Sequence, residues 1–228
     1  MKIKNVKESE YLNKPFSGDF YDADYFERGQ ETGKGWLQNY RWLPRRTFKE
    51  ALAIADYLDL NETSYVLDVG CAKGFIVKAL RELEIKSDGC DISEYALSFA
   101  PKGCWNCSDW TSHYNDGYTH IVIKDMLEHL TLNQLDDLLS TLLNIAPNLF
   151  CVIPMGDDGI YRISEYHMEI SHIIAENEQW WINRFEKNNW KVKKHCPHVP
   201  GLKDNWQSHA NGIGNHVFLL EKKYESVS

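Results

Sequence analysis

The sequence has no apolar run long enough to cross a membrane, and it has no excess of basic residues. Its longest apolar stretches are only a few residues, such as the one from Phe150 to Ile153, whereas a transmembrane helix needs about 20 apolar residues. The first residues also lack the apolar core of a secretory signal peptide. We therefore expect a cytoplasmic protein with no membrane partner.

Basic residues are outnumbered, with 25 Lys and Arg against 33 Asp and Glu in 228 residues and a net charge of −8. Proteins that bind nucleic acid through its phosphates usually carry a basic excess, so the charge disfavours a nucleic-acid partner. Hydrophobic residues make up 43% of the chain, which is normal for a folded domain.

Cysteine is also scarce for a disulfide framework. The six cysteines are Cys71, Cys90, Cys104, Cys107, Cys151 and Cys196. In a chain expected in the cytoplasm they are typical of reduced thiols. Cys104 and Cys107 form a C-x-x-C pair, but a structural zinc site needs four ligands and no second close pair follows. The sequence therefore predicts no metal site.

What the chain does contain is an alternation of strand-like and helical segments, which predicts a parallel sheet with helices on both faces. The expected strands are 65–69, 86–92, 103–107, 119–124, 148–153, 190–196 and 215–221, the last two forming a hairpin-like end to the sheet. The expected helices follow residues 44, 74, 93 and 131, with a last one carrying Ile174, Trp181, Ile182 and Phe185 on one face. A polar stretch runs from 154 to about 171.

The N-terminal residues differ from the rest. Residues 1–42 are polar and rich in aromatics, with glycines that interrupt any long period. We expect them to form an irregular or helical extension, acting as a lid, on a single domain of residues 43–228. Thr131 and Gln134 have the spacing of a capping box for the helix that follows.

The most informative segment lies between residues 66 and 75. A strand-like run ends at Gly70, and a helical pattern opens after Gly74. Such a turn brings free backbone N–H groups close to a ligand. The dinucleotide pattern G-x-G-x-x-G is not met here, since Ala72 stands between the two glycines. Asp68 would repel a diphosphate and attract an ammonium or sulfonium group.

The pattern D-x-G-x-x-x-G from Asp68 to Gly74 resembles motif I of class I S-adenosylmethionine-dependent methyltransferases. In that family an acidic residue after the second strand holds the ribose hydroxyls, and Asp91 matches it. A further acidic residue beside the adenine matches Asp109. The segment from Lys124 to Leu130 resembles the motif after the fourth strand. The resemblance covers about residues 60–155, and it departs from the family at Ala72, where many members carry glycine.

This resemblance implies a Rossmann-like fold with a seven-stranded, mostly parallel sheet. It implies S-adenosylmethionine as cofactor, with S-adenosylhomocysteine as product. The cofactor-binding residues it suggests are Asp68, Gly70, Cys71, Ala72, Gly74, Asp91, Ile92, Asp109, Trp110 and Lys124. To these we add Tyr40 and Arg45 from the aromatic, arginine-rich segment before the first strand, because arginine suits a carboxylate or an anionic acceptor.

Each of these features also has a simpler interpretation. The glycine turn alone could be an ordinary tight turn, and Asp91 would equally suit the ribose of a nicotinamide cofactor. Asp109 could be a turn or cap residue. The arginines near Tyr40 could be a solvated start of a helix.

Candidate catalytic residues follow the fourth and fifth strands, where the ligand crevice of an open α/β sheet lies. They are Asp125, His129, His167 and His172, with Glu128 considered beside them. Methyl transfer from a sulfonium depends mainly on alignment, and a base is needed only when the acceptor holds a proton. For each histidine a surface or capping role is the alternative.

The function we expect is methyl transfer to a small molecule, at an oxygen of a sugar, nucleotide-sugar or glycan precursor that contains sugar or phosphate. The segments Tyr21 to Gly29 and Asn39 to Trp42 resemble the front ends of methyltransferases from bacterial polysaccharide and capsule gene clusters. The alternatives are an RNA- or protein-directed methyltransferase, and a module that binds the cofactor without catalysis. A dehydrogenase is disfavoured by the missing third glycine.

Overall fold

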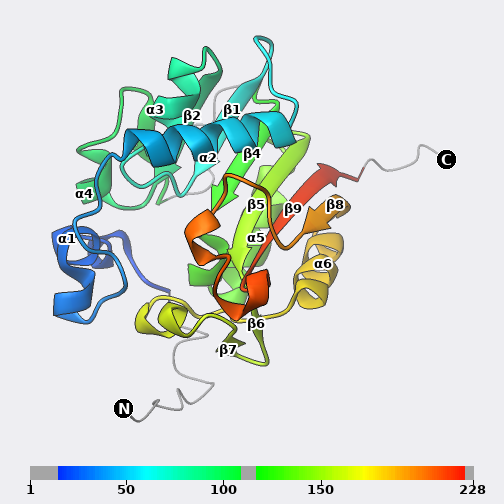
Figure 1. The fold of residues 1–228 in the computed structure, drawn as a ribbon. Helices are drawn as coiled ribbons and strands as arrows, with labels where there is room; N and C mark the ends of the chain where they lie inside the picture. The colour runs from blue at the N-terminus through cyan, green and yellow to red at the C-terminus, as the bar shows by residue number, and fades with distance from the viewer. Residues whose placement is uncertain (1–14, 109–116, 224–228) are drawn as a thin grey trace.

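The structure is a computed structural model, and it describes residues 15–108 and 117–223. Its centre is a seven-stranded sheet in the order β3-β2-β1-β4-β5-β9-β8 (Figure 1). The strands are β1 Tyr65–Val69, β2 Lys86–Asp91, β3 Cys104–Asn106, β4 His120–Lys124, β5 Asn148–Pro154, β8 Trp190–Cys196 and β9 Asn215–Lys222. The first five are parallel to one another, and β9 runs antiparallel to both β5 and β8.

Helices connect the strands and cover the sheet. The α-helices are α1 Ala23–Thr32, α2 Pro44–Tyr57, α3 Phe75–Glu82, α4 Glu94–Leu97, α5 Leu132–Leu142 and α6 Glu178–Lys187. Short 3₁₀ turns are η1 Gly18–Phe20, η2 Leu127–His129, η3 Ser164–Met168, η4 Asp204–Trp206 and η5 Ala210–Gly212. No helix in the described ranges has both the length and the apolar composition that a membrane span requires.

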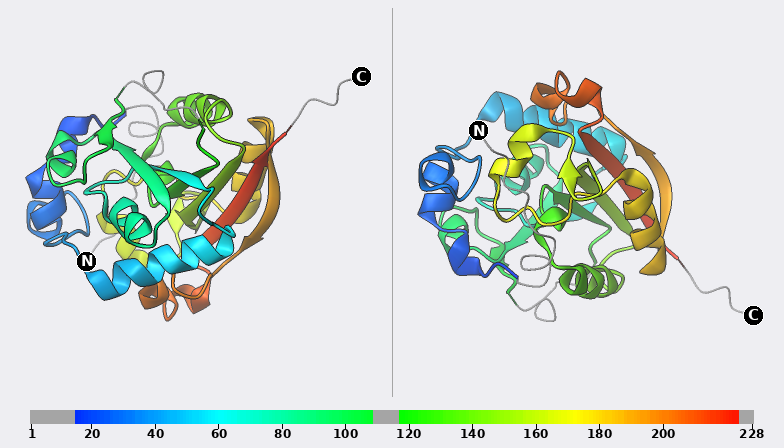
Figure 2. Two further views of the ribbon diagram at one scale, coloured as in Figure 1. Left: turned by 90° about the horizontal axis from the view of Figure 1, so that it is seen from above. Right: turned by 90° about the horizontal axis from the view of Figure 1, so that it is seen from below.

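Two hydrophobic cores lie on opposite faces of the sheet, because successive strand side chains point to opposite sides. On β5, for example, Phe150 and Val152 belong to the core beneath α2 and α3, whereas Leu149 and Cys151 belong to the core beneath α5 and α6. Figure 2 shows α2 on one side of the strands and α5 on the other. The apolar runs that predicted strands are therefore those of a sheet buried on both faces.

The predicted sheet is confirmed, including the antiparallel pair at its end. The capping box of α5 is also confirmed: the Thr131 hydroxyl accepts from the Gln134 N–H, and the Gln134 side chain reaches back to the backbone of Thr131.

One boundary was predicted wrongly. The last helix begins at Glu178, capped by Asn177, so Ile174 lies before it. The reason is that the N–H groups of Ile173 and Ile174 donate to the carbonyl of Glu128, at 2.9 and 3.0 Å, which holds this segment extended.

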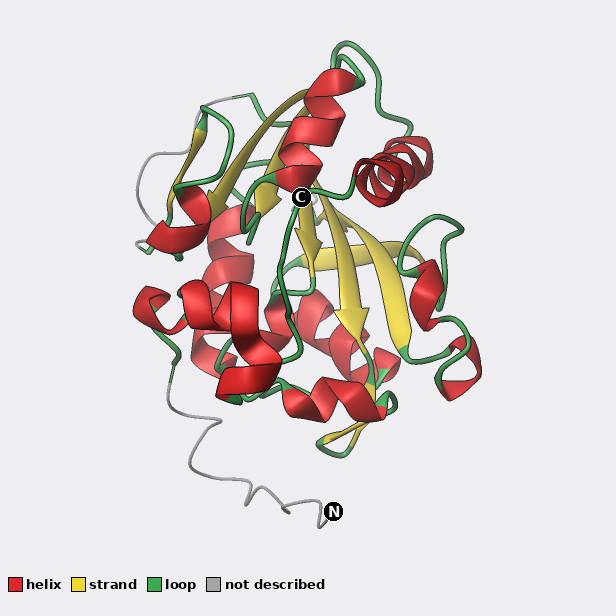
Figure 3. Cartoon of the chain, turned by 60° about the vertical axis from the view of Figure 1, so that its left-hand side comes forward, coloured by secondary structure: helices red, strands yellow, loops and turns green. Residues whose placement is uncertain are grey.

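The polar stretch after β5 also contains structure that its composition did not indicate. Two short strands, β6 Gly156–Asp157 and β7 Ile160–Tyr161, pair as a hairpin beyond the end of β5. Figure 3 shows this hairpin and several short helical turns gathered beyond the carboxyl ends of the parallel strands. This edge is the one at which ligands bind in open α/β sheets.

Candidate functional site

The turn between β1 and α3 is shaped by backbone geometry. Gly70 and Gly74 have φ of +79° and +67°, in the left-handed region that favours glycine. A Cβ at Gly70 would lie 2.6 Å from Cγ of Met126, so the turn passes directly against the loop that follows β4. The N–H groups of Gly70 and Cys71 both donate to the carbonyl of Cys90, at 2.8 and 3.0 Å. The ends of β1, β2 and β4 are thereby held together.

Asp91 joins the turn after β1 to the turn after β2. One carboxylate oxygen accepts from the N–H of Ala72 and the other from the N–H of Ser93, each at 2.8 Å. Burial raises the pKa of Asp91, while these N–H donors oppose the rise. Each oxygen keeps a lone pair, so the carboxylate can still accept from a hydroxyl of a ligand.

Asp68 is the second carboxylate at this edge, and it is only 4% exposed. Within residues 15–108 and 117–223 no group donates a hydrogen bond to it. Burial raises its pKa to about 7, even though the Lys124 ammonium opposes the rise. A buried carboxyl group without a donor lacks compensation for the loss of water, and a cationic ligand group would supply it.

The cofactor candidates later in the sequence lie in other surroundings. Ile92 is half-buried and lies against the N-terminal extension, since a Cβ at Gly18 would meet its carbonyl oxygen. The neighbouring Ser93 hydroxyl donates to the carbonyl of Tyr21. Asp109 and Trp110 lie outside the described residues.

Lys124 and Asp125, at the end of β4, belong to a buried charge network. The Lys124 ammonium lies 2.9 Å from the Asp125 carboxylate and 3.9 Å from Glu50 of α2. Lys203, from the long connection between β8 and β9, pairs with the other oxygen of Asp125. Burial alone would raise the pKa of Asp125, but the two lysines overcome it and hold that pKa well below its ordinary value. This arrangement suits an anchoring carboxylate better than a proton acceptor.

Glu128, His129 and His172 form a compact cluster, although His172 lies 43 residues after His129 in the sequence. One ligand-type atom of each lies within 4.8 Å of the others. The Glu128 side chain is fully buried, and its oxygen lies 3.7 Å from Nε2 of His172. Burial raises the pKa of Glu128 well above its ordinary value. Burial also lowers the pKa of His129 to about 4 and that of His172 well below 6.5, so both imidazoles are neutral near pH 7.

His167, the remaining catalytic candidate, does not join this cluster. It is exposed, and its Nε2 accepts from the N–H of Tyr161 at 3.1 Å. This contact ties η3 to the β6–β7 hairpin.

No protein-family model matches the sequence, and no curated protein matches it either. Solved structures do match. A chain in the complex of the Haloferax volcanii Trm112 methyltransferase activator and its candidate methyltransferase has 14% identity and a TM-score of 0.66, covering 93% of this chain and 100% of its own. Haemonchus contortus phosphoethanolamine N-methyltransferase 2, in complex with S-adenosyl-L-methionine, has 14% identity and a TM-score of 0.64, covering 92% of this chain and 60% of its own. The [4+2]-cyclase SpnF has 12% identity and a TM-score of 0.58, covering 78% and 82%.

The chain has the class I methyltransferase fold. At these identities the likeness establishes the fold alone, and the cyclase among the neighbours illustrates that one fold can serve more than one reaction. The predicted Rossmann-like fold class is confirmed. The gene-cluster resemblance of the N-terminal segments has no counterpart among these three neighbours.

In this methyltransferase fold the N-terminal extension is attached to the site at two places. Lys73, next to Ala72 in the glycine turn, pairs with Glu27 and donates to the carbonyl of Tyr40 at 2.8 Å. At the other place, the N–H of Trp36 donates to the carboxylate of Glu169 at 3.1 Å. Ser171 donates to the same carboxylate at 3.2 Å. Residues 27 to 40 therefore connect the glycine turn after β1 with the segment that contains Glu169 and Ser171.

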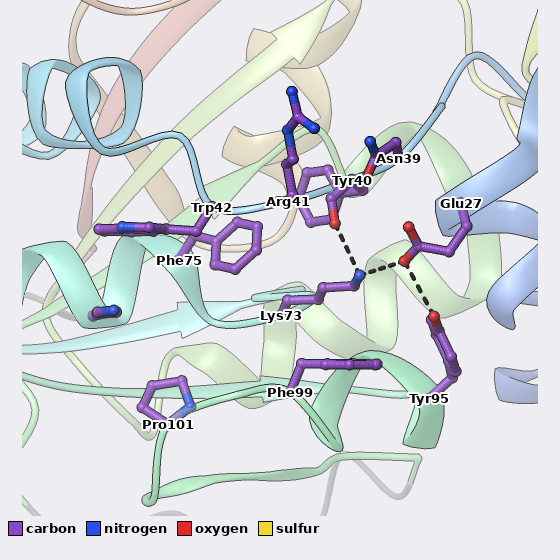
Figure 4. Close-up of a pocket in the computed structure, with 11 residues that line it drawn as sticks. Glu27, Asn39, Tyr40, Arg41, Trp42, Lys73, Phe75, Tyr95, Phe99 and Pro101 are labelled. Carbon is purple, nitrogen blue, oxygen red and sulfur yellow. Dashed lines mark hydrogen bonds and ion pairs between the residues drawn. The ribbon is translucent and has the colours of Figure 1, made fainter.

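Beside the start of α3 the extension also forms a cavity of about 780 Å³ (Figure 4). Figure 4 shows Lys73 between Tyr40 and Glu27, with Tyr95 donating to Glu27. Tyr40 contributes to the wall, its ring lying 5.1 Å from that of Phe75, and burial raises its pKa to about 12. Asp68, Gly70 and Asp91 are not among the residues that line this cavity, so it is separate from the carboxylate pair. Arg45 is exposed on the first turn of α2 and does not line it.

Two buried charged residues of the site were not predicted from the sequence. Glu169 and Lys203 are both buried polar residues, 6% and 4% exposed. Each stands in a polar segment where a charged side chain is normally solvated, so no local signal distinguished them. Of the C-x-x-C cysteines, the thiol of Cys104 interacts with Cys71 and that of Cys107 with Cys90.

Proposed function

We propose that the chain is an S-adenosylmethionine-dependent methyltransferase. The observation that carries the proposal is the pair of carboxylates, Asp68 and Asp91, on either side of the glycine turn at the carboxyl ends of β1 and β2. A ligand with two vicinal hydroxyls and an ammonium group matches this pair, because the hydroxyls donate to Asp91 and the ammonium pairs with Asp68. The cofactor, when bound, supplies a methyl group activated on a sulfonium.

The residues of the chain then have separate tasks. Asp91 accepts from the ribose and holds the turn, while the glycine turn admits the ligand close to the backbone. Asp68 neutralises the ammonium. The N-terminal extension, which already covers Ile92 and Ser93, acts as a lid over the nucleoside side of the crevice. Water exclusion by such a lid protects the reacting atoms and strengthens their polar contacts.

For the acceptor we propose a small molecule that presents a hydroxyl, of the sugar, nucleotide-sugar or glycan-precursor class. The support is chemical: two neutral imidazoles, whose Nε2 lone pairs can accept a hydroxyl proton, lie together with a buried carboxyl group beyond the end of β4. The net charge of −8 gives little attraction for RNA. The most specific part of this proposal is that the acceptor belongs to polysaccharide biosynthesis.

The test is transfer of labelled methyl groups. The purified full chain is incubated with methyl-labelled S-adenosylmethionine and dialysed cell extract supplemented with a metabolite pool, and the label is then separated by size. We expect label in a small anionic or sugar-containing product. Label that enters only RNA or protein would replace this acceptor class by a macromolecule. Bound cofactor recovered unchanged would indicate a binding module.

The carboxyl pKa values predict how cofactor affinity depends on pH. Asp68 titrates at about 7 in the free protein, and a bound ammonium lowers that pKa, so binding below about pH 7 must first remove a proton. The affinity for S-adenosylhomocysteine should therefore fall about tenfold between pH 8 and about pH 6. Isothermal titration calorimetry across this range measures it.

Asp68→Asn is the matched variant, because it keeps the size of the side chain and removes the titration. It should bind more weakly at pH 8 and lose most of the pH dependence. If the unmodified chain binds equally well at all these pH values, Asp68 does not face the ammonium.

A further inference from the structure

The cluster of Glu128, His129 and His172 contains a carboxylate that the fold leaves without a partner. Both oxygens of Glu128 are buried and, within the described residues, neither has a hydrogen-bond partner. Burying a carboxyl group without such partners is costly. The main chain of Glu128 is hydrogen-bonded, because its carbonyl accepts from the N–H groups of both Ile173 and Ile174. The backbone thus fixes the side chain in a place where its own oxygens remain unsatisfied.

The histidines on either side of this carboxylate are held in one tautomer. His172 uses Nδ1, which donates to the carbonyl of Tyr166 at 3.1 Å. A carbonyl only accepts, so the proton is on Nδ1 and the lone pair is on Nε2. That Nε2 is the atom lying 3.7 Å from the Glu128 oxygen.

His129 is held in the same way through a hydroxyl. Its Nδ1 lies 2.9 Å from Oγ of Ser171, and this hydroxyl donates its proton to Glu169 at 3.2 Å. When Glu169 is ionised, the hydroxyl accepts from His129, which places the proton on Nδ1 and leaves Nε2 free. A metal-binding histidine usually has its second nitrogen fixed by a carbonyl or carboxylate partner, and both histidines here have one, directly or through Ser171.

We propose that Glu128, His129 and His172 bind one divalent transition-metal ion, in the range from Mn²⁺ to Zn²⁺. Two imidazoles favour these ions over Mg²⁺ and Ca²⁺, which prefer oxygen ligands alone. Three protein ligands leave coordination positions open, as in catalytic metal sites. Ligand atoms already within 4.8 Å of one another need to close by only about 1 Å to meet an ion at normal bond lengths.

A bound ion would limit the acceptor of the proposed methyl transfer to molecules that can coordinate it. This part of the inference rests on the proposed function. An acceptor with two neighbouring oxygens, such as a vicinal diol, fills the open positions. Coordination lowers the pKa of the hydroxyl, which releases its proton to water. The oxygen then forms a bond to the methyl carbon as the bond from that carbon to sulfur breaks, and the sulfonium becomes a neutral thioether.

Charges nearby are compatible with a bound cation. Asp125 lies at the same end of the crevice, but it is paired with Lys124 and Lys203, so that network is one positive charge in excess of its carboxylate. Glu50, also close to Lys124, pairs with the half-exposed Arg46 as well, so it is shared between two cations. The ionised Glu128 is then the charge that the ion neutralises. Without an ion, a protonated and therefore uncharged Glu128 beside His172 is the competing explanation of the same geometry.

The test is direct metal binding by the full chain after dialysis against a chelator. Mn²⁺ is titrated in and its free electron paramagnetic resonance signal recorded, and Zn²⁺ and Mg²⁺ are compared by calorimetry. We expect one Mn²⁺ or Zn²⁺ per chain and much weaker Mg²⁺. Glu128→Gln, which keeps the shape of the side chain, should weaken binding at least tenfold. His167→Ala, the matched control on an exposed histidine outside the cluster, should leave it unchanged.

If the parent chain binds Mn²⁺ and Zn²⁺ no more strongly than Glu128→Gln does, the metal site is overturned. If the two chains also have the same melting temperature, Glu128 is protonated in the parent. S-adenosylhomocysteine binding is measured in the same metal-free samples. If it persists while Mn²⁺ and Zn²⁺ fail to bind, the proposed function stands and the metal site does not. If the ion binds but no cofactor does, the proposed function is the part that fails.

Discussion

Asp91→Ala should weaken cofactor binding about a hundredfold or more. The ribose hydroxyls lose an ionised acceptor, and hydrogen bonds to charged groups are each worth about 1.5–3 kcal/mol. Two of them correspond to a loss in affinity for S-adenosylhomocysteine of about a hundredfold or more. The N–H groups of Ala72 and Ser93 also lose their acceptor, which loosens the glycine turn itself. Calorimetry with S-adenosylhomocysteine measures the loss.

Asp137→Ala is the control for this experiment, because Asp137 is an exposed carboxylate on α5. It should bind the cofactor as the parent does. Since Asp91→Ala also removes two backbone contacts, its melting temperature is recorded beside the titration. A folded Asp91→Ala chain that binds within threefold of the parent would place the ribose elsewhere.

The second large effect is expected at Lys203. Replacing it by methionine keeps the buried stem but removes the charge, so Asp125 keeps only Lys124 as a partner. Breaking a fully buried ion pair from one side costs about 3 kcal/mol or more, but Asp125 is 31% exposed and keeps Lys124, so the cost here is smaller. The contact of the ammonium with the Tyr166 ring, 4.9 Å from its centroid, is lost as well. We expect Lys203→Met to lower the free energy of unfolding by about 1–2 kcal/mol, measured by urea denaturation.

A double variant separates the charge from the packing. Asp125→Asn combined with Lys203→Met removes both charges, so its destabilisation should be smaller than the sum of the two single effects. Lys193→Met is the surface control, since Lys193 pairs with Glu221 at an exposed position of β8. A Lys203→Met chain as stable as the parent would mean that the ion pair does not hold the β8–β9 connection in place.

The elements that the sequence predicted are those with a local cause. The strands β1, β4 and β5 are short apolar runs in a sheet buried on both faces, and such runs are visible without any knowledge of partners. The start of α5 was visible because its cap is made within four residues. Asp68 was singled out by its place before the glycine turn, and Asp91 by the resemblance to the methyltransferase family, so the ligand-binding roles of both stay predictions.

The parts that were not predicted depend on contacts between distant segments. Ile174 has the spacing of a helical residue, but the Glu128 carbonyl draws its backbone out of the helix. The convergence of Glu128 with His172 depends on that same contact. Lys203 is buried only because Asp125 lies opposite, and a lysine in a loop with glycines and prolines gives no indication of it. Ion pairs between distant segments leave no regular spacing in the sequence, so no sequence pattern indicates them.

The contact between Trp36 and Glu169 has a consequence for how the crevice works as a whole. One hydrogen-bonded chain runs from the Trp36 N–H through Glu169 and Ser171 to His129, so the position of the extension and the state of His129 are parts of a single equilibrium. Linkage between two such events is reciprocal. A change at His129 that strengthens its hydrogen bond to Ser171 should therefore also favour the contact between Trp36 and Glu169. The N-terminal extension thus reaches the histidine cluster as well as the nucleoside end, since the Tyr21 ring also lies 5.9 Å from that of His129.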